Sequence, residues 1–362
     1  MPKHILAINP GSTSTKVALY RDHEALFSKS LVHGDVVQKF DGILNQYPMR
    51  LEAIEEFLRE NGIDVRQLDA IVGRGGLLLP VRTGAYRVNR TMLDRLRDPD
   101  TQPHESNLGA ILADAIAREA KVEAYIYDAV RVDELEDIAR VTGMPEITRV
   151  AATHTLNSRG MCMRLAAQEN KDYLDLNIIV AHMGGGVSLN VHKKGRMVEI
   201  VSDDEGPFSP QRCGAVPCRP LVNMCFSGRY TKADIQRRQK SAGGLMGYLG
   251  TDDTREVERR VLAGDEQAEK ILSAMAYQIA KAIGELAAAV DGEVDHIILT
   301  GGIAYSEMFT GWIAKKVRFI APVRVMPGEC EMEALAFGVL RVLSGEEKAR
   351  EYIEYQGKVL EE

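Results

Sequence analysis

The sequence predicts an α/β fold in which one domain occurs twice. A three-stranded pattern spans residues 3–33 and returns over 177–201, each time with a polar or glycine-rich loop after the first strand. Helical segments that alternate with short apolar strands follow each copy, which is typical of mixed α/β sheets. At 362 residues the chain is also long enough for two domains of ordinary size. An internal duplication explains all three observations.

Composition excludes several classes of protein. Hydrophobic residues make up 45% of the chain and charged residues 27%, which is a globular composition. The net charge of −7 argues against a nucleic-acid-binding surface, although a local group of cations can still bind an anionic ligand. Residues 1–10 lack the apolar core of a signal peptide, and no apolar run reaches the roughly 18 residues that a membrane span needs. We expect a soluble cytoplasmic protein that binds neither nucleic acid nor membrane.

The cysteines do not form a recognisable framework. They are odd in number and lack C-x-x-C spacing, so neither a zinc site nor a set of disulfides is expected. Buried reduced thiols are the ordinary alternative for the five residues Cys162, Cys213, Cys218, Cys225 and Cys330.

The elements of the first copy follow from apolar spacing and from turn residues. In chain order we expect a hairpin over 5–20, a strand over 24–33, a helix that ends at Asn61-Gly62, a buried strand over 69–73, a helix that begins near His104, and a strand over 124–128. Two of these strands end on polar residues, Arg74 and Asp128. Polar groups at strand ends are typical of functional sites in α/β folds.

The second copy repeats this arrangement. We expect strands over 177–182, 187–191 and 196–201, a long helix over 268–290, a strand over 295–300 before a glycine turn, a strand over 323–326 and a helix from 331. The predicted domains are 1–149 and 150–336, with a C-terminal helix at about 337–362 that returns to the first domain. Hinges are expected at 149–152 and before the last helix, with a cleft between the domains.

The loop from Asn9 to Lys16 is the first candidate binding element. It gathers backbone N–H groups, hydroxyls and one ammonium within a few residues, which suits phosphate oxygens. A Walker loop is excluded because its spacing and its following helix are absent. The triple glycine at 184–186 is not a Rossmann loop, since a strand follows it. An ordinary Ser/Thr-rich turn is the alternative for the first loop.

Two meanders that each direct such a loop into one cleft resemble the layout of the actin-like ATPase superfamily. There, two ribonuclease-H-like domains, each a mixed five-stranded sheet flanked by helices, enclose a nucleotide. Within it the chain resembles the acetokinase family, and more closely its butyrate kinase branch. The motifs that carry this resemblance are Asn9-x-Gly11-Ser12-x-Ser14-x-Lys16, the segment GPFSPQRCG at 206–214, and PGECEMEALA at 327–336.

The resemblance implies a kinase that transfers the γ-phosphoryl group of ATP, with Mg²⁺, reversibly and in line to butyrate or a related short acid, giving an acyl phosphate and ADP. A carboxylic acid with a pKa near ~4.5 is already ionised at neutral pH, so the reaction needs no general base. Such a site must supply cations and positioning. A homodimer or a larger homo-oligomer is implied as well.

Roles for individual residues follow from the same resemblance. Arg74 is expected to bind the acid carboxylate and Arg212 the transferring phosphoryl group, through bidentate contacts that Lys cannot reproduce. His154 is expected to stabilise the phosphoryl group, with Asn9 and Asp128 completing the catalytic set. His104 corresponds to a second position near the substrate. Weak surface ion pairs and structural histidines are the alternatives for these side chains.

Metal and nucleotide contacts are implied in the same way. Mg²⁺ is expected near Asn9, Asp128 and Glu331, although Glu331 could equally stabilise a helix N-terminus by its charge. The nucleotide-binding residues implied are Ser12, Ser14, Lys16, His182, Gly184, Gly185, Gly186, Gly301 and Gly302. Gly185 stands where acetate kinases carry Asn, so backbone N–H groups are expected to contribute more.

The substrate pocket departs from acetate kinases at Gly75 and Gly76, where those enzymes carry branched aliphatic residues. We therefore expect Gly75 and Gly76 to leave room for an acyl chain of about four carbons. Isobutyrate, isovalerate and propionate are alternative acceptors. A sugar kinase would need a carboxylate base such as Asp128. A non-enzymatic actin-like nucleotide-binding module would need neither arginine.

Overall fold

The computed structural model describes residues 1–151, 153–355 and 357–360. By its internal contacts the chain separates into two compact units: Met1–Glu134 with Cys330–Glu362, and Leu135–Glu329. The first junction therefore falls earlier than the boundary expected near Arg149. The expected hinge includes Ala152, which lies outside the described residues.

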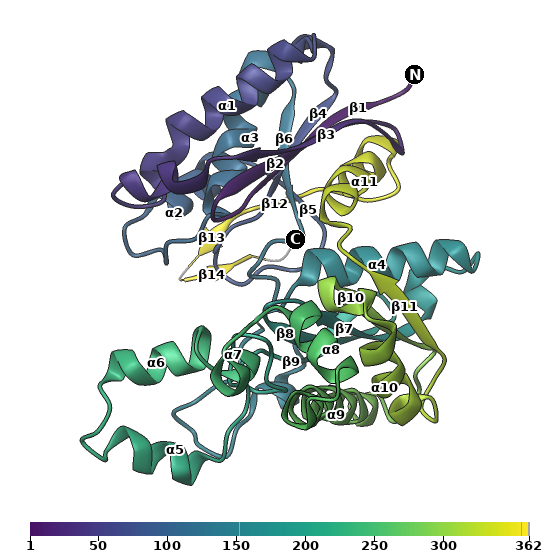
Figure 1. The fold of residues 1–362 in the computed structure, drawn as a ribbon. Coiled ribbons are helices and arrows are strands. Elements are labelled where there is room, and N and C mark those ends of the chain that lie inside the picture. The colour runs from purple at the N-terminus through teal and green to yellow at the C-terminus, as the bar shows by residue number, and fades with distance from the viewer. Residues whose placement is uncertain (152, 356, 361–362) are drawn as a thin grey trace. The chain divides into compact units, whose positions relative to one another are not determined.

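The first unit contains a seven-stranded mixed sheet with the strand order β12-β5-β6-β4-β1-β2-β3 (Figure 1). Its strands are β1 (His4–Pro10), β2 (Ser14–Arg21), β3 (Glu24–Val32), β4 (Ala70–Arg74), β5 (Ala85–Arg87), β6 (Glu123–Tyr127) and β12 (Arg350–Glu351). Its helices are α1 (Tyr47–Glu60), α2 (Arg90–Arg97), α3 (Asn107–Ala120), α11 (Glu331–Ser344) and the 3-10 helices η1 (Gly34–Lys39), η2 (Leu44–Gln46) and η3 (Val65–Gln67). A separate hairpin joins β13 (Glu354–Tyr355) to β14 (Lys358–Val359).

The second unit contains a five-stranded sheet with the order β11-β10-β7-β8-β9. Its strands are β7 (Asn177–Met183), β8 (Val187–Lys193), β9 (Arg196–Val201), β10 (His296–Gly301) and β11 (Val323–Pro327). Its α-helices are α4 (Thr155–Gln168), α5 (Cys218–Cys225), α6 (Lys232–Lys240), α7 (Gly244–Leu249), α8 (Thr254–Leu262), α9 (Glu266–Ala288) and α10 (Glu307–Val317). Short 3-10 helices complete it: η4 (Asp137–Arg140), η5 (Tyr173–Asp175) and η6 (Gly302–Tyr305).

The two sheets share one topology, which confirms the predicted duplication. In the first, β3-β2-β1 are antiparallel neighbours and β4 and β6 continue parallel to β1. In the second, β9-β8-β7 are antiparallel and β10 and β11 continue parallel to β7. The expected five strands match the second sheet. The first extends this pattern with β5 and β12.

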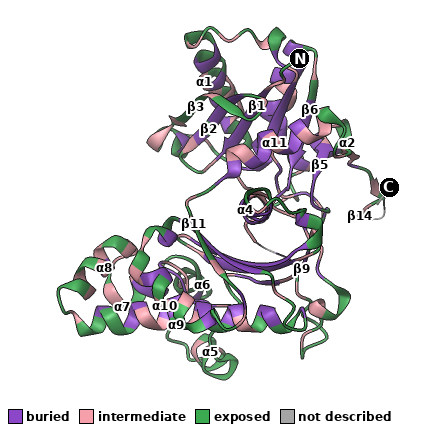
Figure 2. Cartoon of the chain, turned by 90° about the vertical axis from the view of Figure 1, so that its right-hand side faces the viewer, coloured by how far each residue is buried: buried purple, intermediate pink, exposed green. Residues whose placement is uncertain are grey.

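Helices pack against both sheets, whose central strands are buried. In the second unit, α9 packs against β7, β8 and β9 and contributes a long row of buried apolar side chains to the core. Buried residues accordingly follow the strands and one side of α9 (Figure 2). Within the described part of the chain, no helix combines the length and the apolar character that crossing a bilayer requires.

Close contact between α3 and β4 depends on two glycines. A Cβ atom on Gly73 would lie 2.1 Å from the Gly109 carbonyl oxygen, and one on Gly109 would lie 2.2 Å from that of Arg74. Such distances are far shorter than any van der Waals contact, so both positions need glycine. The N-terminal part of α3 is thereby held beside the end of β4 that carries Arg74.

The C-terminal segment differs from the expected helix over about 337–362. Helix α11 begins at Glu331 and ends at Ser344, because Gly345 adopts a left-handed conformation (φ 82°) that terminates the helix. The short strands β12, β13 and β14 follow instead. Gln356, Glu361 and Glu362 lie outside the described residues.

The cysteines are free thiols, and the expectation that all are buried is wrong. Cys162 and Cys330 are buried, whereas Cys218 and Cys225 are exposed. Both exposed residues lie on α5, which contributes no buried side chain to the core.

Candidate active site

The β1–β2 hairpin places the first predicted group of site residues. Its strands pair in a register that sets Asn9 opposite Lys16, so both side chains lie on one face. The turn closes with a hydrogen bond from the Gly11 N–H to the Ser14 carbonyl at 2.8 Å. Asn9 is buried, whereas Ser12 and Lys16 are exposed. The hairpin therefore offers both fixed and solvent-facing polar groups.

Asn9 belongs to a hydrogen-bonded trio with Arg74 and Glu331. Its Nδ2 donates to Glu331 Oε2 at 2.6 Å. Arg74 Nη1 lies 3.3 Å from Glu331 Oε1 and 3.5 Å from Asn9 Oδ1. The Arg74 Nε is buried without a hydrogen-bond partner in the described chain. Strands β1 and β4 and helix α11 thus bring together three predicted site residues, and Glu331 partly neutralises Arg74.

The glycines after Arg74 have a different role from the one expected. A Cβ on Gly75 would lie 2.5 Å from Ala129 Cβ, and a Cβ on Gly76 would lie 2.5 Å from Asn107 Oδ1. The volume beside both glycines is therefore filled by the unit's own atoms. This corrects the idea that Gly75 and Gly76 enlarge the acyl pocket. They allow the chain to pack closely as it leaves β4.

Asp128 follows β6 and is buried in an uncommon conformation. Its φ is 41°, which few residues other than glycine adopt, and its Oδ1 accepts from the Gly84 N–H at 2.7 Å. A buried carboxylate held in such a conformation at a strand end is typical of functional positions. No hydrogen bond between Asp128 and either Asn9 or Glu331 is seen in the described structure.

His104 lies just before α3 and accepts a hydrogen bond. The Ser106 N–H donates to His104 Nδ1 at 3.1 Å, so the ring proton belongs on Nε2. Burial lowers the pKa of His104, the nearby Arg74 lowers it further, and Glu105 opposes the shift. A neutral His104 is therefore favoured at neutral pH.

In the second unit, His154 and His182 form a stacked pair. Their ring centroids lie 4.1 Å apart with an interplanar angle of 16°. His154 Nδ1 lies 3.0 Å from Ser188 Oγ, and Asn157 Nδ2 donates to His182 Nδ1 at 2.9 Å. The second bond assigns the His182 proton to Nε2. Strand β7 and the start of α4 therefore bring together two predicted histidines.

Arg212 lies against the glycine turn between β7 and β8. A Cβ on Gly186 would lie 2.4 Å from Arg212 Nη1, so any other residue there would displace the guanidinium from its present position. Arg212 also forms an ion pair with Asp203, and burial lowers its pKa. The Ser209 Oγ donates to the Gly185 carbonyl at 2.8 Å, which ties the two loops together.

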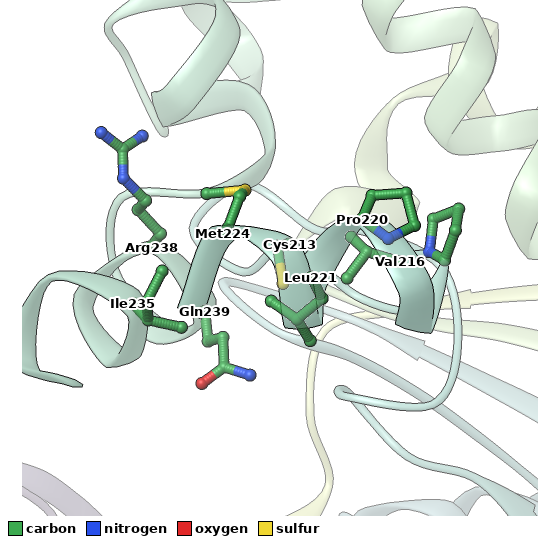
Figure 3. A pocket seen from close by; sticks show the side chains of 9 residues that line it. Cys213, Val216, Pro220, Leu221, Met224, Ile235, Arg238 and Gln239 are labelled. Carbon is green, nitrogen blue, oxygen red and sulfur yellow. The ribbon is translucent and has the colours of Figure 1, made fainter. Parts of the chain in front are cut away.

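Helices α5 and α6 support the loop that carries Arg212. The Cys213 N–H donates to the Gln239 carbonyl at 3.2 Å, and the Gly243 N–H donates to the Gln211 carbonyl at 3.0 Å. Behind Cys213 lies a mostly apolar cavity of about 150 Å³ (Figure 3). Leu221 and Met224 of α5 and Ile235 of α6 contribute to its lining.

A larger cavity of about 520 Å³ brings together three predicted nucleotide-binding glycines, Gly184, Gly185 and Gly302. Gly301 does not line it. A positive φ of 89° and a close approach to the Met183 backbone require glycine at that position. The other residues that line the cavity are Pro210, Asp252, Thr254, Arg255, Glu258, Ile303, Tyr305 and Ser306. It offers an aromatic ring, carboxylates, a guanidinium and hydroxyls within a single unit.

Several of these residues were not predicted from the sequence. Asp252 receives a hydrogen bond from Gln211 Nε2 at 2.7 Å, and Glu258 receives one from Ser306 Oγ at 2.9 Å. Asp203 pairs with Arg212. Each of these contacts joins segments that are separate in sequence, and no local spacing rule identifies them. The buried Arg50, described below, is a further example.

The candidate Mg²⁺ ligands fit only an open site, in which the protein supplies a few of the ligands and water and phosphate supply the rest. Among the described residues no three His, Cys, Asp or Glu side chains gather into a metal-binding cluster. Mg²⁺ commonly uses one or two carboxylates together with water and substrate phosphates, so a closed cage is not required. The buried Asp128 carboxylate and the Asn9–Glu331 pair are compatible with such partial coordination.

Comparison with known proteins identifies relatives over nearly the whole chain. Residues 149–317 match the model of the acetokinase family. Butyrate kinase 2 of Clostridium acetobutylicum is 47% identical over 96% of this chain and 99% of its own. A probable butyrate kinase 2 of Caldanaerobacter subterraneus subsp. tengcongensis is also 47% identical, over 96% of this chain and 99% of its own.

Solved structures agree at the level of the fold. Acetate kinase of Porphyromonas gingivalis is similar with a TM-score of 0.78 and 18% identity, covering 94% of this chain and all of its own. A propionate kinase of Francisella tularensis gives a TM-score of 0.72 at 17% identity, covering 93% and 98%. The fold is thus that of the actin-like acetate and propionate kinases. With near-full-length relatives at this identity, the chain belongs to the acetokinase family.

Proposed function

We propose that this protein is an ATP-dependent kinase that phosphorylates butyrate or a closely related short acid, giving an acyl phosphate and ADP. The observation that carries the proposal is the 47% identity to a butyrate kinase over nearly the full length of both chains. Acceptors such as isobutyrate, isovalerate and propionate remain alternatives within the same chemistry.

The proposed mechanism rests on cations rather than on a base. The acceptor is already a carboxylate at neutral pH, so its oxygen can attack phosphorus without losing a proton. We assign the acceptor carboxylate to Arg74, whose Nη1 is oriented by Glu331 and Asn9. Arg212 and His154 would compensate the charge on the transferring phosphoryl group. The γ-phosphorus to oxygen bond of ATP breaks as the bond to the carboxylate forms.

The nucleotide is assigned to the cavity lined by Gly184, Gly185 and Gly302. Its volume of about 520 Å³ lies in the usual range for small-molecule sites. The lining supports this assignment, because Tyr305 provides an aromatic face and Asp252 can accept from ribose hydroxyls. Ser12, Ser14 and Lys16 are assigned to the phosphates.

Mg²⁺ would be held by Asp128, by Asn9 or Glu331, and by the phosphates of ATP. When bound, the ion would neutralise phosphate charge and fix the geometry of transfer. Cytoplasmic location and assembly into a homodimer or a larger homo-oligomer stay predictions.

The proposal is tested by trapping the product. Purified protein is incubated with ATP, Mg²⁺ and butyrate in the presence of hydroxylamine, which converts an acyl phosphate into a coloured hydroxamate. We expect hydroxamate to form in step with ADP, and an Arg212→Ala variant with the wild-type melting temperature to form far less. Absence of hydroxamate with butyrate, isobutyrate and propionate would refute the proposal.

A further inference from the structure

Arg50 is a fully buried cation of the first unit that no step above uses. It lies on α1 with an exposed fraction of 0%. Arginine is among the residues least often buried completely, and a buried one normally faces a carboxylate. Among the described residues Arg50 forms no ion pair. Its hydrogen-bond acceptors are the neutral atoms Gly11 O, Ser12 O, Ser14 O, Thr15 Oγ1 and Gln46 Oε1.

These acceptors belong mainly to the loop between β1 and β2. Arg50 Nη2 donates to the carbonyls of Gly11 at 2.8 Å and Ser12 at 3.3 Å. Its Nη1 donates to the Ser14 carbonyl at 3.0 Å and to Thr15 Oγ1 at 2.9 Å. One guanidinium therefore binds three backbone carbonyls of the same hairpin turn, those of Gly11, Ser12 and Ser14.

The orientation of the peptide planes follows from these bonds. In a trans peptide the carbonyl of one residue and the N–H of the next point in opposite directions. Since the Gly11 and Ser12 carbonyls face Arg50, the N–H groups of Ser12 and Thr13 face away from it. Neither N–H donates to an acceptor in the described chain, and both residues are exposed. Two neighbouring backbone donors are thus available to an anion.

A second buried residue fixes Arg50 itself. Gln46 Oε1 accepts from Arg50 Nε at 3.1 Å and from Nη2 at 2.9 Å, while Gln46 Nε2 donates to the Val37 carbonyl at 3.4 Å. Burial lowers the pKa of Arg50, and the nearby Glu105 opposes this shift. Burial also lowers the pKa of His33, whose Nε2 lies 2.8 Å from Thr15 Oγ1, and the Arg50 charge lowers it further. The positive charge of Arg50 therefore affects His33, which contacts Thr15 at the base of the loop.

We propose that Arg50 is the positioning residue of the phosphate-binding loop. It turns the loop carbonyls inward, presents the N–H groups of Ser12 and Thr13 to the phosphoryl oxygens of ATP, and supplies a fixed positive charge behind them. This inference rests on the proposed function, because the anion is the ATP phosphate. Backbone donors polarised by a buried cation bind an oxyanion more strongly than neutral donors do.

The sharpest test replaces Gln46 by Glu. This change keeps an oxygen at the position that accepts from Arg50, but adds a negative charge that neutralises the guanidinium. The matched control is Gln67→Glu, which adds the same charge at an exposed position on η3 of the same unit. Both variants are compared with wild type by calorimetric titration with ATP and Mg²⁺, by the KM values for ATP and butyrate, and by thermal unfolding.

We expect Gln46→Glu to weaken ATP binding about tenfold, and to raise the KM for ATP to match, because an opposing charge is placed close behind the loop. The KM for butyrate should change less than about twofold. The melting temperature should change little, because only the long 3.4 Å bond from Gln46 Nε2 to the Val37 carbonyl is lost. Gln67→Glu should match wild type. A purely structural role for Arg50 predicts wild-type ATP affinity in Gln46→Glu, since the oxygen that accepts from Arg50 Nε and Nη2 is kept, and that result would overturn the proposal.

The Arg50→Lys variant is a second, independent test, because it separates the charge of residue 50 from its hydrogen bonds. A lysine retains the charge but cannot donate to the separate acceptors that the guanidinium reaches. We expect kcat to fall while the KM for ATP stays closer to wild type than in Gln46→Glu. Wild-type kcat in a folded Arg50→Lys variant would contradict the positioning role. A wild-type protein that neither binds ATP nor forms acyl phosphate would refute the proposed function itself, and this inference with it.

Discussion

Arg74 is held in one orientation by neighbours on two other elements. Its Nη1 lies within 3.5 Å of both Glu331 and Asn9. A guanidinium fixed in this way can present its remaining donors to a carboxylate at little entropic cost. At the residue scale, the proposed recognition of the acid by Arg74 therefore depends on the planar fork as well as on the charge.

Replacing Arg74 by Lys tests this dependence. We expect the KM for butyrate to rise about tenfold or more, because one ammonium cannot make the bidentate contact. ATP affinity measured by calorimetry should stay near wild type. Equal KM values for butyrate in wild type and Arg74→Lys would show that Arg74 does not bind the acid.

Glu331 can be tested for its two candidate roles. Both of its oxygens already face Arg74 or Asn9, so we expect Glu331→Gln to act mainly through Arg74. The KM for butyrate should rise severalfold, while the Mg²⁺ concentration for half-maximal activity changes by less than about twofold. A large shift in the Mg²⁺ requirement with an unchanged KM for butyrate would instead make Glu331 a metal ligand.

At the scale of elements, the turn after β4 depends on its glycines for packing. We expect Gly76→Ala to destabilise the protein by roughly 1–3 kcal/mol, because the added methyl group would overlap Asn107. The ratio of kcat/KM for butyrate to that for propionate should not change. Gly143→Ala is the control, since its new Cβ would meet nothing within 4 Å. Denaturant unfolding and the two acids provide the measurements, and a changed ratio would restore the pocket interpretation.

Strand β8 carries a buried histidine that predicts how stability depends on pH. Burial lowers the pKa of His192 to about 3, and Arg159 contributes to the shift. Between about pH 6.5 and 3 the unfolded state binds a proton that the native state does not, so stability falls as pH falls. From this group the slope is about 1.4 kcal/mol per pH unit, and it vanishes above pH 6.5.

His192→Gln should therefore be less stable at pH 7, where the bond to the Tyr173 hydroxyl at 2.7 Å is altered, yet show a shallower decline between pH 6 and 4. Urea unfolding at several pH values measures both quantities. Parallel curves for the two proteins would contradict the assignment of a neutral buried imidazole.

Some elements could be predicted from the sequence and others could not, depending on whether local residues determine them. The β1–β2 hairpin and the long helix α9 could be predicted, because local spacing and turn residues determine them. The role of Gly75 and Gly76 could not, since the atoms that fill the space beside them come from β6, α2, α3 and residue 129. The burial of Arg50 could not be predicted either, because most of its hydrogen-bond partners lie far from it in sequence. One arginine on an amphipathic helix resembles a solvated residue until the fold buries it.

For the whole molecule, the repeat was the most reliable prediction. Each unit builds an antiparallel meander and then adds two parallel strands, so the same three-stranded pattern in sequence produces the same sheet twice. The proposed site residues do not repeat in this way. Arg74 and Glu331 belong to the first unit, and His154 and Arg212 to the second. The two units thus share a scaffold but differ in the proposed site residues that they carry.

We propose, above all, that the protein transfers phosphate to a four-carbon acid. The most direct measurement is kcat/KM for acetate, propionate, butyrate, isobutyrate and valerate under one set of ATP and Mg²⁺ concentrations, with acyl phosphate trapped as hydroxamate. We expect kcat/KM to be highest for butyrate or isobutyrate and much smaller for acetate. Comparable values for acetate and butyrate, or no product with any of the five acids, would contradict it.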